Sequence, residues 1–334
     1  MRRVLRLGCL VLVVTCVLLA FFSKLGAAVP AQAMLQGTTD GIRVFGLVNS
    51  PLNLTYDELQ SFPMVSEVAE LKCVSGSPDV TYNWTGIPLF YLLTLAQVKP
   101  EAYKVVSRAS DGFSSDLLIE DALKPTTILA LGANGTDLPE ISGIKGLYRL
   151  VVPCKWGYKW VGNLTEIEVV DYDYKGTYES NGQSDEANRS DSTVLPSITP
   201  PIQELNLGSG NRTFNVEAFT NVSINAATLD YSQKKISLNI TVPSGTTGFA
   251  DFILKQDFLK GPYNVSVDTQ AVNTVEADLI NQSYLYIAFP EGIHTVEITA
   301  TDVFVPEFPT YLIVLLPVAV TVMAVIVSKR RHST

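Results

Sequence analysis

Two long apolar runs stand near the ends of the 334-residue chain, and short apolar and polar stretches alternate between them. The first run, Leu7 to Phe22, follows a basic start and precedes small residues that end at Ala33. This order of basic, apolar and small residues is typical of a secretory signal. We therefore expect residues 1–33 to be a signal peptide, with an uncleaved signal anchor as the alternative.

The second apolar run, residues 309–328, is long enough to cross a bilayer as one helix. Residues 329–334 follow it and include Lys329, Arg330 and Arg331. Basic residues next to a membrane helix stay on the cytoplasmic side. The pattern therefore predicts a single-pass protein of the cell membrane whose ectodomain lies outside the cytoplasm.

Strand-like and helix-like patterns mix without a regular rhythm between residues 39 and 178. Thr55 to Leu59 is typical of a helix start, because Thr55 and Glu58 stand at the spacing of a capping box. Further helices are expected at 88–96 and 117–123, and strands at 41–48, 147–152 and 164–170. This mixture predicts an α+β domain over residues 39–178.

The pattern changes after residue 178. Residues 179–200 contain few large apolar side chains, so we expect a linker there. Residues 201–304 carry short runs rich in Val, Ile, Thr, Phe and Tyr, separated by turn residues, which is typical of a small antiparallel β-sandwich. The whole chain is thus expected to combine an α+β domain, a β-sandwich domain and one C-terminal transmembrane helix.

Charge is unevenly distributed along the chain. The formal charge of the whole is -9, but the part between the apolar ends has 17 basic and 33 acidic residues, a formal charge of -16. Such a charge argues against nucleic acid and against an anionic membrane surface as partners. The same part contains ten Asn-x-Ser/Thr sequons, a density that is typical of a surface glycoprotein.

Cysteine and histidine are scarce in the part that would be exported. Only Cys73 and Cys154 lie outside the predicted signal, and His294 is the single histidine before the basic tail. This composition argues strongly against a histidine-centred triad or a multi-histidine zinc site. Two cysteines are too few for a disulfide scaffold, which leaves open a Cys73–Cys154 disulfide or a chemical role for one of them.

One block reverses the sign of the charge. Residues 143–162 contain four basic residues and no acidic one, namely Lys145, Arg149, Lys155 and Lys159. In an acidic protein, such a block favours the binding of a phosphate or another oxyanion. The alternative is a basic strand edge that acidic residues from elsewhere in the chain neutralise.

Short motifs follow one another in order from Val44 to Gly176. Among them are GLV at 46–48, LTYDEL at 54–59, LKCVSG at 71–76, SDG at 110–112, RLVVP at 149–153 and WGYKWV at 156–161. In this order and spacing, they resemble the molybdopterin-binding domain of the sulfite oxidase family, which includes the catalytic subunit of periplasmic methionine sulfoxide reductase. The resemblance implies a mixed sulfite-oxidase-type fold for residues 39–178.

The resemblance also implies roles for single residues. In that family the cysteine of the CVSG motif gives its thiolate to molybdenum, so Cys73 is expected to be the metal ligand and part of the catalytic site. Soft thiolate sulfur suits such a metal. Ser110 and Asp111 fall where the family lines the cofactor pocket.

The basic block corresponds to the part of the family that holds the phosphate of the pterin. Arg149 and the segment formed by Lys159, Trp160 and Val161 are the expected cofactor-binding residues. Lys155 and Tyr158 are expected beside them as catalytic residues of the pocket wall.

Two positions depart from the pattern of the family. Gly162 stands where members commonly have a lysine, and residues 75–79 lack the arginine that sulfite-oxidising members place after the cysteine. Lys155 or Arg108 would have to replace that arginine. Sulfite is therefore disfavoured as the substrate.

Together these patterns predict a membrane-anchored, extracytoplasmic oxidoreductase that depends on molybdenum-molybdopterin (Mo-MPT) and moves an oxygen atom on a small substrate. An external electron-transfer protein is its expected partner, because the sequence contains no haem-attachment motif. The alternative is a cofactor-free cell-surface binding or envelope protein that retains the fold. Residues 305–309, VPEFP, resemble the element before the anchors of archaeal cell-surface proteins, which favours a protein of that archaeal type.

Overall fold

The computed structural model describes residues 41–302, except residues 77, 78, 142, 143, 145, 193, 257 and 258. The predicted signal peptide at 1–33, the predicted membrane helix at 309–328 and the basic tail at 329–334 lie outside this part of the chain, as does the VPEFP element. Among the described residues, no helix has the length and apolar composition needed to span a bilayer.

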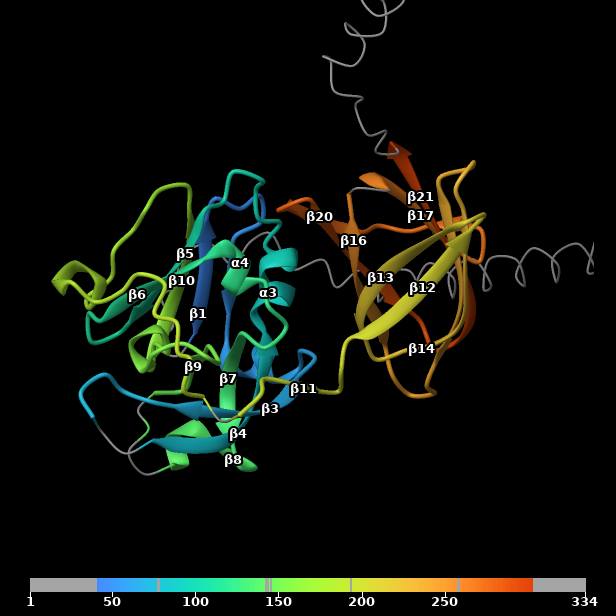
Figure 1. The fold of residues 1–334 in the computed structure, drawn as a ribbon. Coiled ribbons are helices and arrows are strands. Elements are labelled where there is room, and N and C mark those ends of the chain that lie inside the picture. The colour runs from blue at the N-terminus through green and yellow to red at the C-terminus, as the bar shows by residue number, and fades with distance from the viewer. Residues whose placement is uncertain are drawn as a thin grey trace, which may run out of the picture.

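The first half of the described chain contains two sheets (Figure 1). In the first sheet the strand order is β2-β1-β10-β5-β6. Its strands are β1 (Ile42–Gly46), β2 (Leu52–Leu54), β5 (Lys104–Ala109), β6 (Ser114–Leu118) and β10 (Leu164–Val170). β1 and β10 pair in parallel, with Val44 opposite Ile167, and the other neighbours in this sheet are antiparallel.

The second sheet has the order β11-β3-β4-β7-β8, and β9 pairs with β7 at its side. Its strands are β3 (Val65–Leu71), β4 (Val80–Pro88), β7 (Ile128–Ala133), β8 (Thr136–Asp137), β9 (Arg149–Val151) and β11 (Ile198–Thr199). All its described pairings are antiparallel. This sheet positions both β3, which leads to Cys73, and β9, which begins with Arg149.

Helices are few and short. The α-helices are α2 (Tyr56–Gln60), α3 (Leu89–Leu95) and α4 (Ile119–Ala122), and the 3-10 turns are η1 (Leu138–Glu140), η2 (Gly157–Lys159) and η3 (Glu179–Asn181). The capping box of Thr55 and Glu58 forms as expected. The longest helix in the described residues, α3, has only seven residues.

The expected fold class, α+β with a C-terminal transmembrane helix, is therefore wrong for the described chain, which consists mostly of β-sheet. The physical reason is visible at residues 117–123, where Leu117 pairs with Val105 across two strands. Only Ile119–Ala122 remain helical. Pairing with the preceding strand β5 in a hairpin thus overrides the local helical pattern.

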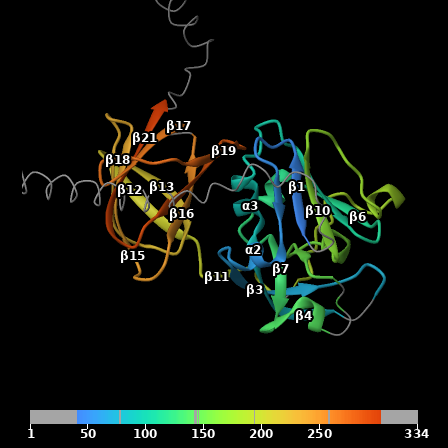
Figure 2. The ribbon, with the colours of Figure 1, turned by 180° about the vertical axis from the view of Figure 1, so that it is seen from behind.

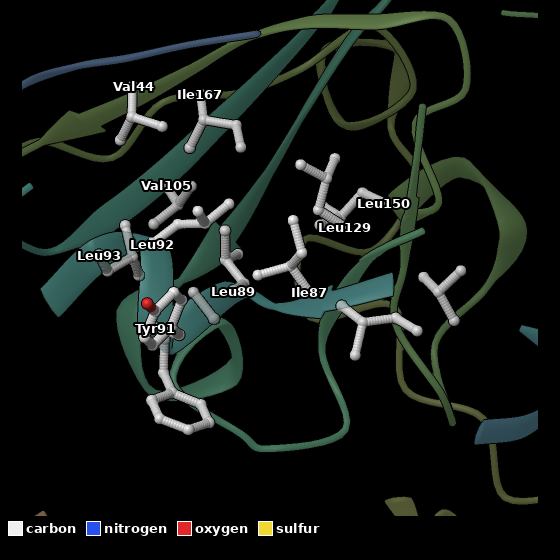
Figure 3. Close-up of a cluster of buried hydrophobic side chains, with 14 of the residues drawn as sticks. Val44, Ile87, Leu89, Tyr91, Leu92, Leu93, Val105, Leu129, Leu150 and Ile167 are labelled. Atoms are coloured by element: carbon white, nitrogen blue, oxygen red, sulfur yellow. The ribbon is translucent and has the colours of Figure 1, made fainter. Parts of the chain in front are cut away.

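The core of the first half lies between α3 and the two sheets. Leu89, Leu92 and Leu93 of α3 are fully buried, as are Val105 and Ile167 of the first sheet. Figure 3 shows these side chains grouped together, with Ile87, Leu129 and Leu150 of the second sheet beside them. One buried cluster therefore fixes both sheets around the helix.

The second half contains two antiparallel five-stranded sheets around a separate buried cluster (Figure 1). One has the order β12-β13-β16-β20-β19, with strands Gln203–Ser209, Arg212–Thr220, Gly248–Lys255, Gln282–Phe289 and Val275–Leu279. The other has the order β14-β15-β21-β17-β18, with strands Ser223–Asp230, Lys235–Val242, Gly292–Asp302, Lys260–Val267 and Gln270–Ala271. Alternating residues of each long strand face the shared core.

The two halves meet next to α3, as the ribbon in Figure 2 shows. Tyr91 of α3 lies edge-on to Phe219, Phe249 and Tyr286, with ring centroids 5.7–5.9 Å apart. Phe90 also lies edge-on to Phe219, at 5.6 Å. The core of the first half thus continues into the second.

Residues 179–192, in the segment expected to be a linker, pack onto the first half. Glu179, Ala187 and Arg189 are buried. Farther along the same segment, β11 adds Ile198 and Thr199 to the second sheet. We refer to residues 173–191 as the acidic strap, because Asp173, Glu179, Asp185, Glu186 and Asp191 all lie in it.

Candidate functional site

Cys73 lies two residues beyond β3, in a loop that η2 approaches closely. The N–H of Gly157 donates a hydrogen bond of 2.7 Å to the carbonyl oxygen of Lys72. A Cβ atom at position 157 would lie 2.8 Å from that oxygen and 3.3 Å from Cys73 Sγ. Glycine at this position therefore lets the WGYKWV segment pass directly beside the cysteine.

The thiols of Cys73 and Cys154 are both free and partly buried. The alternative of a Cys73–Cys154 disulfide is therefore wrong in this structure. An unbridged sulfur at Cys73 keeps the lone pairs that a soft metal ion would use.

Arg149, the first residue of β9, brings positive charge to the same place. Its Nη1 donates a hydrogen bond of 2.8 Å to the carbonyl oxygen of Trp160. Burial lowers the pKa of Arg149, and nearby Cys73 opposes this shift, because a thiolate favours the charged guanidinium. Within the described chain, the buried Nε of Arg149 has no hydrogen-bond partner. One donor of a cation beside the cysteine is thus left for another acceptor.

Gly162 makes room for this arginine. A Cβ atom at position 162 would collide with Nη2 of Arg149. A lysine, which family members commonly have there, would displace the guanidinium from its present position. Glycine at position 162, where this chain departs from the family pattern, therefore leaves the space that the guanidinium of Arg149 fills.

Ser110 is held next to this group by Asn163, which follows Gly162 in the chain. The N–H of Ser110 donates a hydrogen bond of 3.0 Å to the carbonyl oxygen of Asn163, and Asn163 Nδ2 donates to Ser110 Oγ. The carboxylate of Asp111 instead accepts a hydrogen bond of 3.1 Å from the N–H of Phe113. Asp111 thus stabilises its own turn, whereas Ser110 and Asn163 connect β5 to the Gly162 segment.

Lys159 is held away from solvent by acidic residues. Its side chain is 1% exposed, and its Nζ lies 2.7 Å from Glu179 and 3.4 Å from Asp116. Lys104, also fully buried, lies 2.8 Å from both Asp116 and Asp185. These carboxylates use the donors of Lys159, so the expected role of this residue as a phosphate anchor has no support in the geometry.

The ammonium group of Lys155 also has its partners within the protein. Its Nζ lies 2.6 Å from Asp121 and donates hydrogen bonds of 2.9 Å to the carbonyl oxygen of Glu186 and 2.8 Å to Asn188 Oδ1. The acidic partners come from elsewhere in the chain, as the alternative interpretation of the basic block supposed. Lys155 fastens the acidic strap to η2 and to α4.

The remaining expected site residues are parts of the core or of the strap contact. Tyr158 donates a hydrogen bond of 2.6 Å to the carbonyl oxygen of Ser184 and stacks on Tyr178, and burial raises its pKa to about 12. Trp160 and Val161 are both 1% exposed. Their carbonyl groups accept hydrogen bonds from Arg149 and Leu150. They position Arg149 through the backbone.

Sequence reasoning did not identify Arg189 of the acidic strap. Its guanidinium donates a hydrogen bond of 2.7 Å to Glu70 and lies 5.5 Å from the ring centre of Trp156. The backbone N–H of Arg189 also donates a hydrogen bond to the carbonyl oxygen of Cys154. The strap thus ties the end of β3 to the segment beside Cys73. The polar sequence of the strap carried no local signal for this packing.

Three comparisons with known proteins bear on this site. Residues 29–178 match the family described as the oxidoreductase molybdopterin binding domain. The chain is 29% identical over 141 residues to the uncharacterised oxidoreductase YuiH of Bacillus subtilis (strain 168), covering 42% of this chain and 70% of that protein. It is 30% identical over 155 residues to the protein-methionine-sulfoxide reductase catalytic subunit MsrP of Gluconobacter oxydans (strain 621H), covering 41% of this chain and 49% of that protein.

Among solved structures, the sulfane dehydrogenase SoxCD from Paracoccus pantotrophus covers 78% of this chain and 68% of its own, with 17% sequence identity and a TM-score of 0.39. A TM-score at this level does not establish a shared fold. The sequence comparisons, in contrast, agree with the predicted resemblance. Residues 29–178 are thus similar to the oxidoreductase molybdopterin binding domain and to oxidoreductases that include an MsrP subunit.

The residues at the site fit a molybdopterin cofactor at its metal end. Cys73 offers a free thiol, and beside it Arg149 offers a partly buried cation whose Nε has no hydrogen-bond partner in the described part of the chain. Lys155 and Lys159 do not fit as phosphate anchors, because carboxylates and carbonyl oxygens already surround them. The structure therefore favours Cys73 and Arg149 as cofactor-binding residues over Lys155 and Lys159.

Proposed function

We propose that this protein is an extracytoplasmic, molybdopterin-dependent oxidoreductase that transfers an oxygen atom to or from a small substrate. The observation that carries the proposal is the unbridged Cys73 thiol beside the partly buried guanidinium of Arg149, in a region that matches the molybdopterin-binding family. When bound, the cofactor supplies the two-electron exchange that accompanies oxygen-atom transfer.

Cys73 would hold the metal of the cofactor through its sulfur. A thiolate is a soft ligand, and coordination keeps it deprotonated. The loop that carries Cys73 is fixed on one side by the hydrogen bond from Gly157 to Lys72. The backbone that presents Cys73 is therefore fixed at Lys72 before the cofactor arrives.

Arg149 stabilises negative charge at the site. Its Nη1 is held by the carbonyl oxygen of Trp160, so the plane of the guanidinium has a fixed orientation. The unpartnered Nε can donate to an oxyanion of the cofactor or of the substrate. In this role Arg149 replaces the lysine that the family commonly has at the position of Gly162.

The proposed location and the proposed redox partner rest on features of the sequence. Location outside the cytoplasm is supported by the signal-like residues 1–33 and by the ten sequons. An external electron-transfer protein is proposed as the redox partner, because the sequence carries no haem-attachment motif. The predicted apolar run at 309–328 lies outside the described residues, and the proposal does not depend on it.

Metal analysis of the purified protein tests the proposal. We expect near-stoichiometric molybdenum in the wild type and loss of nearly all of it in Cys73→Ser. Cys154→Ser is the matched control, because it removes the other partly buried thiol and should keep the metal. Arg149→Gln should lower the molybdenum content without unfolding the protein, as circular dichroism would check.

The second candidate is a cofactor-free envelope or surface-binding protein that retains the fold. The neutralisation of Lys155 and Lys159 by carboxylates favours it. A folded wild-type protein purified without molybdenum, and unable to take up the cofactor from a molybdopterin-producing lysate, would refute the enzyme and leave this candidate.

A further inference from the structure

The ten sequons occupy distinct environments in the structure. Nine of their asparagines are exposed: Asn53, Asn83, Asn134, Asn188, Asn211, Asn221, Asn239, Asn264 and Asn281. The tenth, Asn163, is partly buried beside Ser110. A sequon is a glycan acceptor only if its side chain can reach a transferase.

Asn239 and Asn264 project from one outer sheet surface. On β15, Leu238 and Ile240 face the core, so Asn239 between them faces outward. On β17, Tyr263 and Val265 face the core on either side of outward-facing Asn264. The Nδ2 atoms of both asparagines donate no hydrogen bond within the described residues, although Oδ1 of Asn239 lies 3.3 Å from Nδ2 of Asn225.

The two asparagines lie on opposite sides of β21. Asn239 is paired with Thr295 and Asn264 with Thr299. These partners are four residues apart, which is about 13 Å along a strand, and β15 and β17 are separated by about 10 Å across β21. There is room for a glycan on each asparagine without a clash between their first sugars.

Asn163 has the opposite environment. Its Nδ2, the atom to which a glycan would be attached, donates to Ser110 Oγ. A Cβ atom at Gly146 would lie 2.5 Å from its Cα and Oδ1, so there is little space beside its side chain. A sugar there would separate Ser110 from the Gly162 segment next to Arg149.

We propose that Asn239 and Asn264 carry N-linked glycans and that Asn163 stays unmodified because its side chain is part of the wall of the candidate site. The inference rests on the extracytoplasmic location in the proposed function. The glycans would cover the sheet whose edge strands are β14 and β18, where unpaired backbone groups invite association with other chains.

The attachment is a glycosyl transfer from an activated donor, a glycosyl phosphate or pyrophosphate, by a host transferase. A bond forms between asparagine Nδ2 and the anomeric carbon of the sugar. The bond between that carbon and the phosphate oxygen breaks, the phosphate leaves with the electron pair, and the amide proton passes to a base of the transferase.

The test uses the full chain produced in its native host and recovered from the extracytoplasmic fraction. Peptide mass spectrometry should find sugar on Asn239 and Asn264 and the plain sequence mass at Asn163. Ser266→Ala and Thr241→Val should each remove one glycan from the intact mass. Ser266→Thr and Thr241→Ser, which preserve the sequons, should keep it.

Asn264→Gln and Asn239→Gln provide a second route if a hydroxyl variant fails to fold. Unmodified Asn239 and Asn264 in an extracytoplasmic protein would overturn the inference and leave the proposed location intact. A glycan on Asn163 would overturn the assignment of its side chain to the site wall. Recovery of the chain in the cytoplasm alone would overturn the shared assumption of export, whatever the result for molybdenum.

Discussion

Glu67 offers a quantitative test of the described core. It lies on β3 opposite Trp84 and Ile198, is 1% exposed, and neither carboxylate oxygen has a hydrogen-bond partner within the described residues. Burial raises its pKa from 4.5 to about 8. The folded protein therefore binds this proton more tightly than the unfolded chain does.

The sign of the pH dependence follows from this difference in pKa. Below about pH 4.5 the carboxyl group is protonated in both states, and it does not oppose folding. As the pH rises from 4.5 to about 8, the unfolded chain releases the proton first, and the folded state loses about 1.4 kcal/mol of stability per pH unit. Between pH 5 and pH 7 this amounts to about 2.7 kcal/mol.

Glu67→Gln removes the ionisation and nearly keeps the shape of the side chain. Urea unfolding of the wild type and of this variant at pH 5, 6, 7 and 8 gives the difference in their free energies of unfolding. We expect this difference to move in favour of the variant by about 1.4 kcal/mol per pH unit up to about pH 8. Glu101→Gln, at an exposed glutamate, is the matched control and should show a flat difference.

A difference between Glu67→Gln and the wild type that does not change with pH would refute the reasoning. It would mean that the carboxyl group has an ordinary pKa in the folded protein. In that case either water or a polar group reaches Glu67, and the packing of β3 against Trp84 and Ile198 differs from the structure.

Three further predictions follow from particular contacts. Gly162→Ala should push the guanidinium of Arg149 aside, destabilise the protein by about 1–3 kcal/mol in thermal unfolding and lower its molybdenum content, and an unchanged metal content would contradict the role of this arginine. Lys159→Met should cost about 3–5 kcal/mol in urea unfolding, because it leaves buried carboxylates without their cation, and adding Glu179→Gln should recover part of the loss. Asp251→Asn should stabilise the protein increasingly as the pH rises above about 4, because burial raises the pKa of Asp251 well above its ordinary value of 3.8, and equal melting temperatures for variant and wild type at pH 5 and pH 8 would contradict this.

Local sequence signals predicted the short-range features well. The capping box at Thr55 and Glu58 depends on atoms three residues apart, and it forms as expected. The helix expected at 88–96 also forms, as α3. The overall fold class could not be predicted in the same way, because strands such as β1 and β10 are decided by partners far away in the chain.

The residues of the candidate site show the same difference between features set by local sequence and features set by distant partners. Cys73 was predicted from a contiguous motif, and its thiol is free in the structure. The partners of Lys159 were not, because Asp116 and Glu179 lie 43 and 20 positions away from it, and the acids of the strap follow no helical or strand period. Whether a lysine meets a phosphate or a carboxylate is decided by such distant groups.

The aromatic contact around α3 extends beyond the part of the chain that the family model matches. The region matched by the family ends at residue 178, well before Phe219 and Phe249. A fragment that ends at residue 178 would lose the rings that cover Phe90 and Tyr91, and these two side chains would become exposed to water. It would also lose most of the acidic strap, which packs next to the loop that carries Cys73. An expression fragment of the matched region therefore needs the strands after residue 200 if these ring contacts are to be kept.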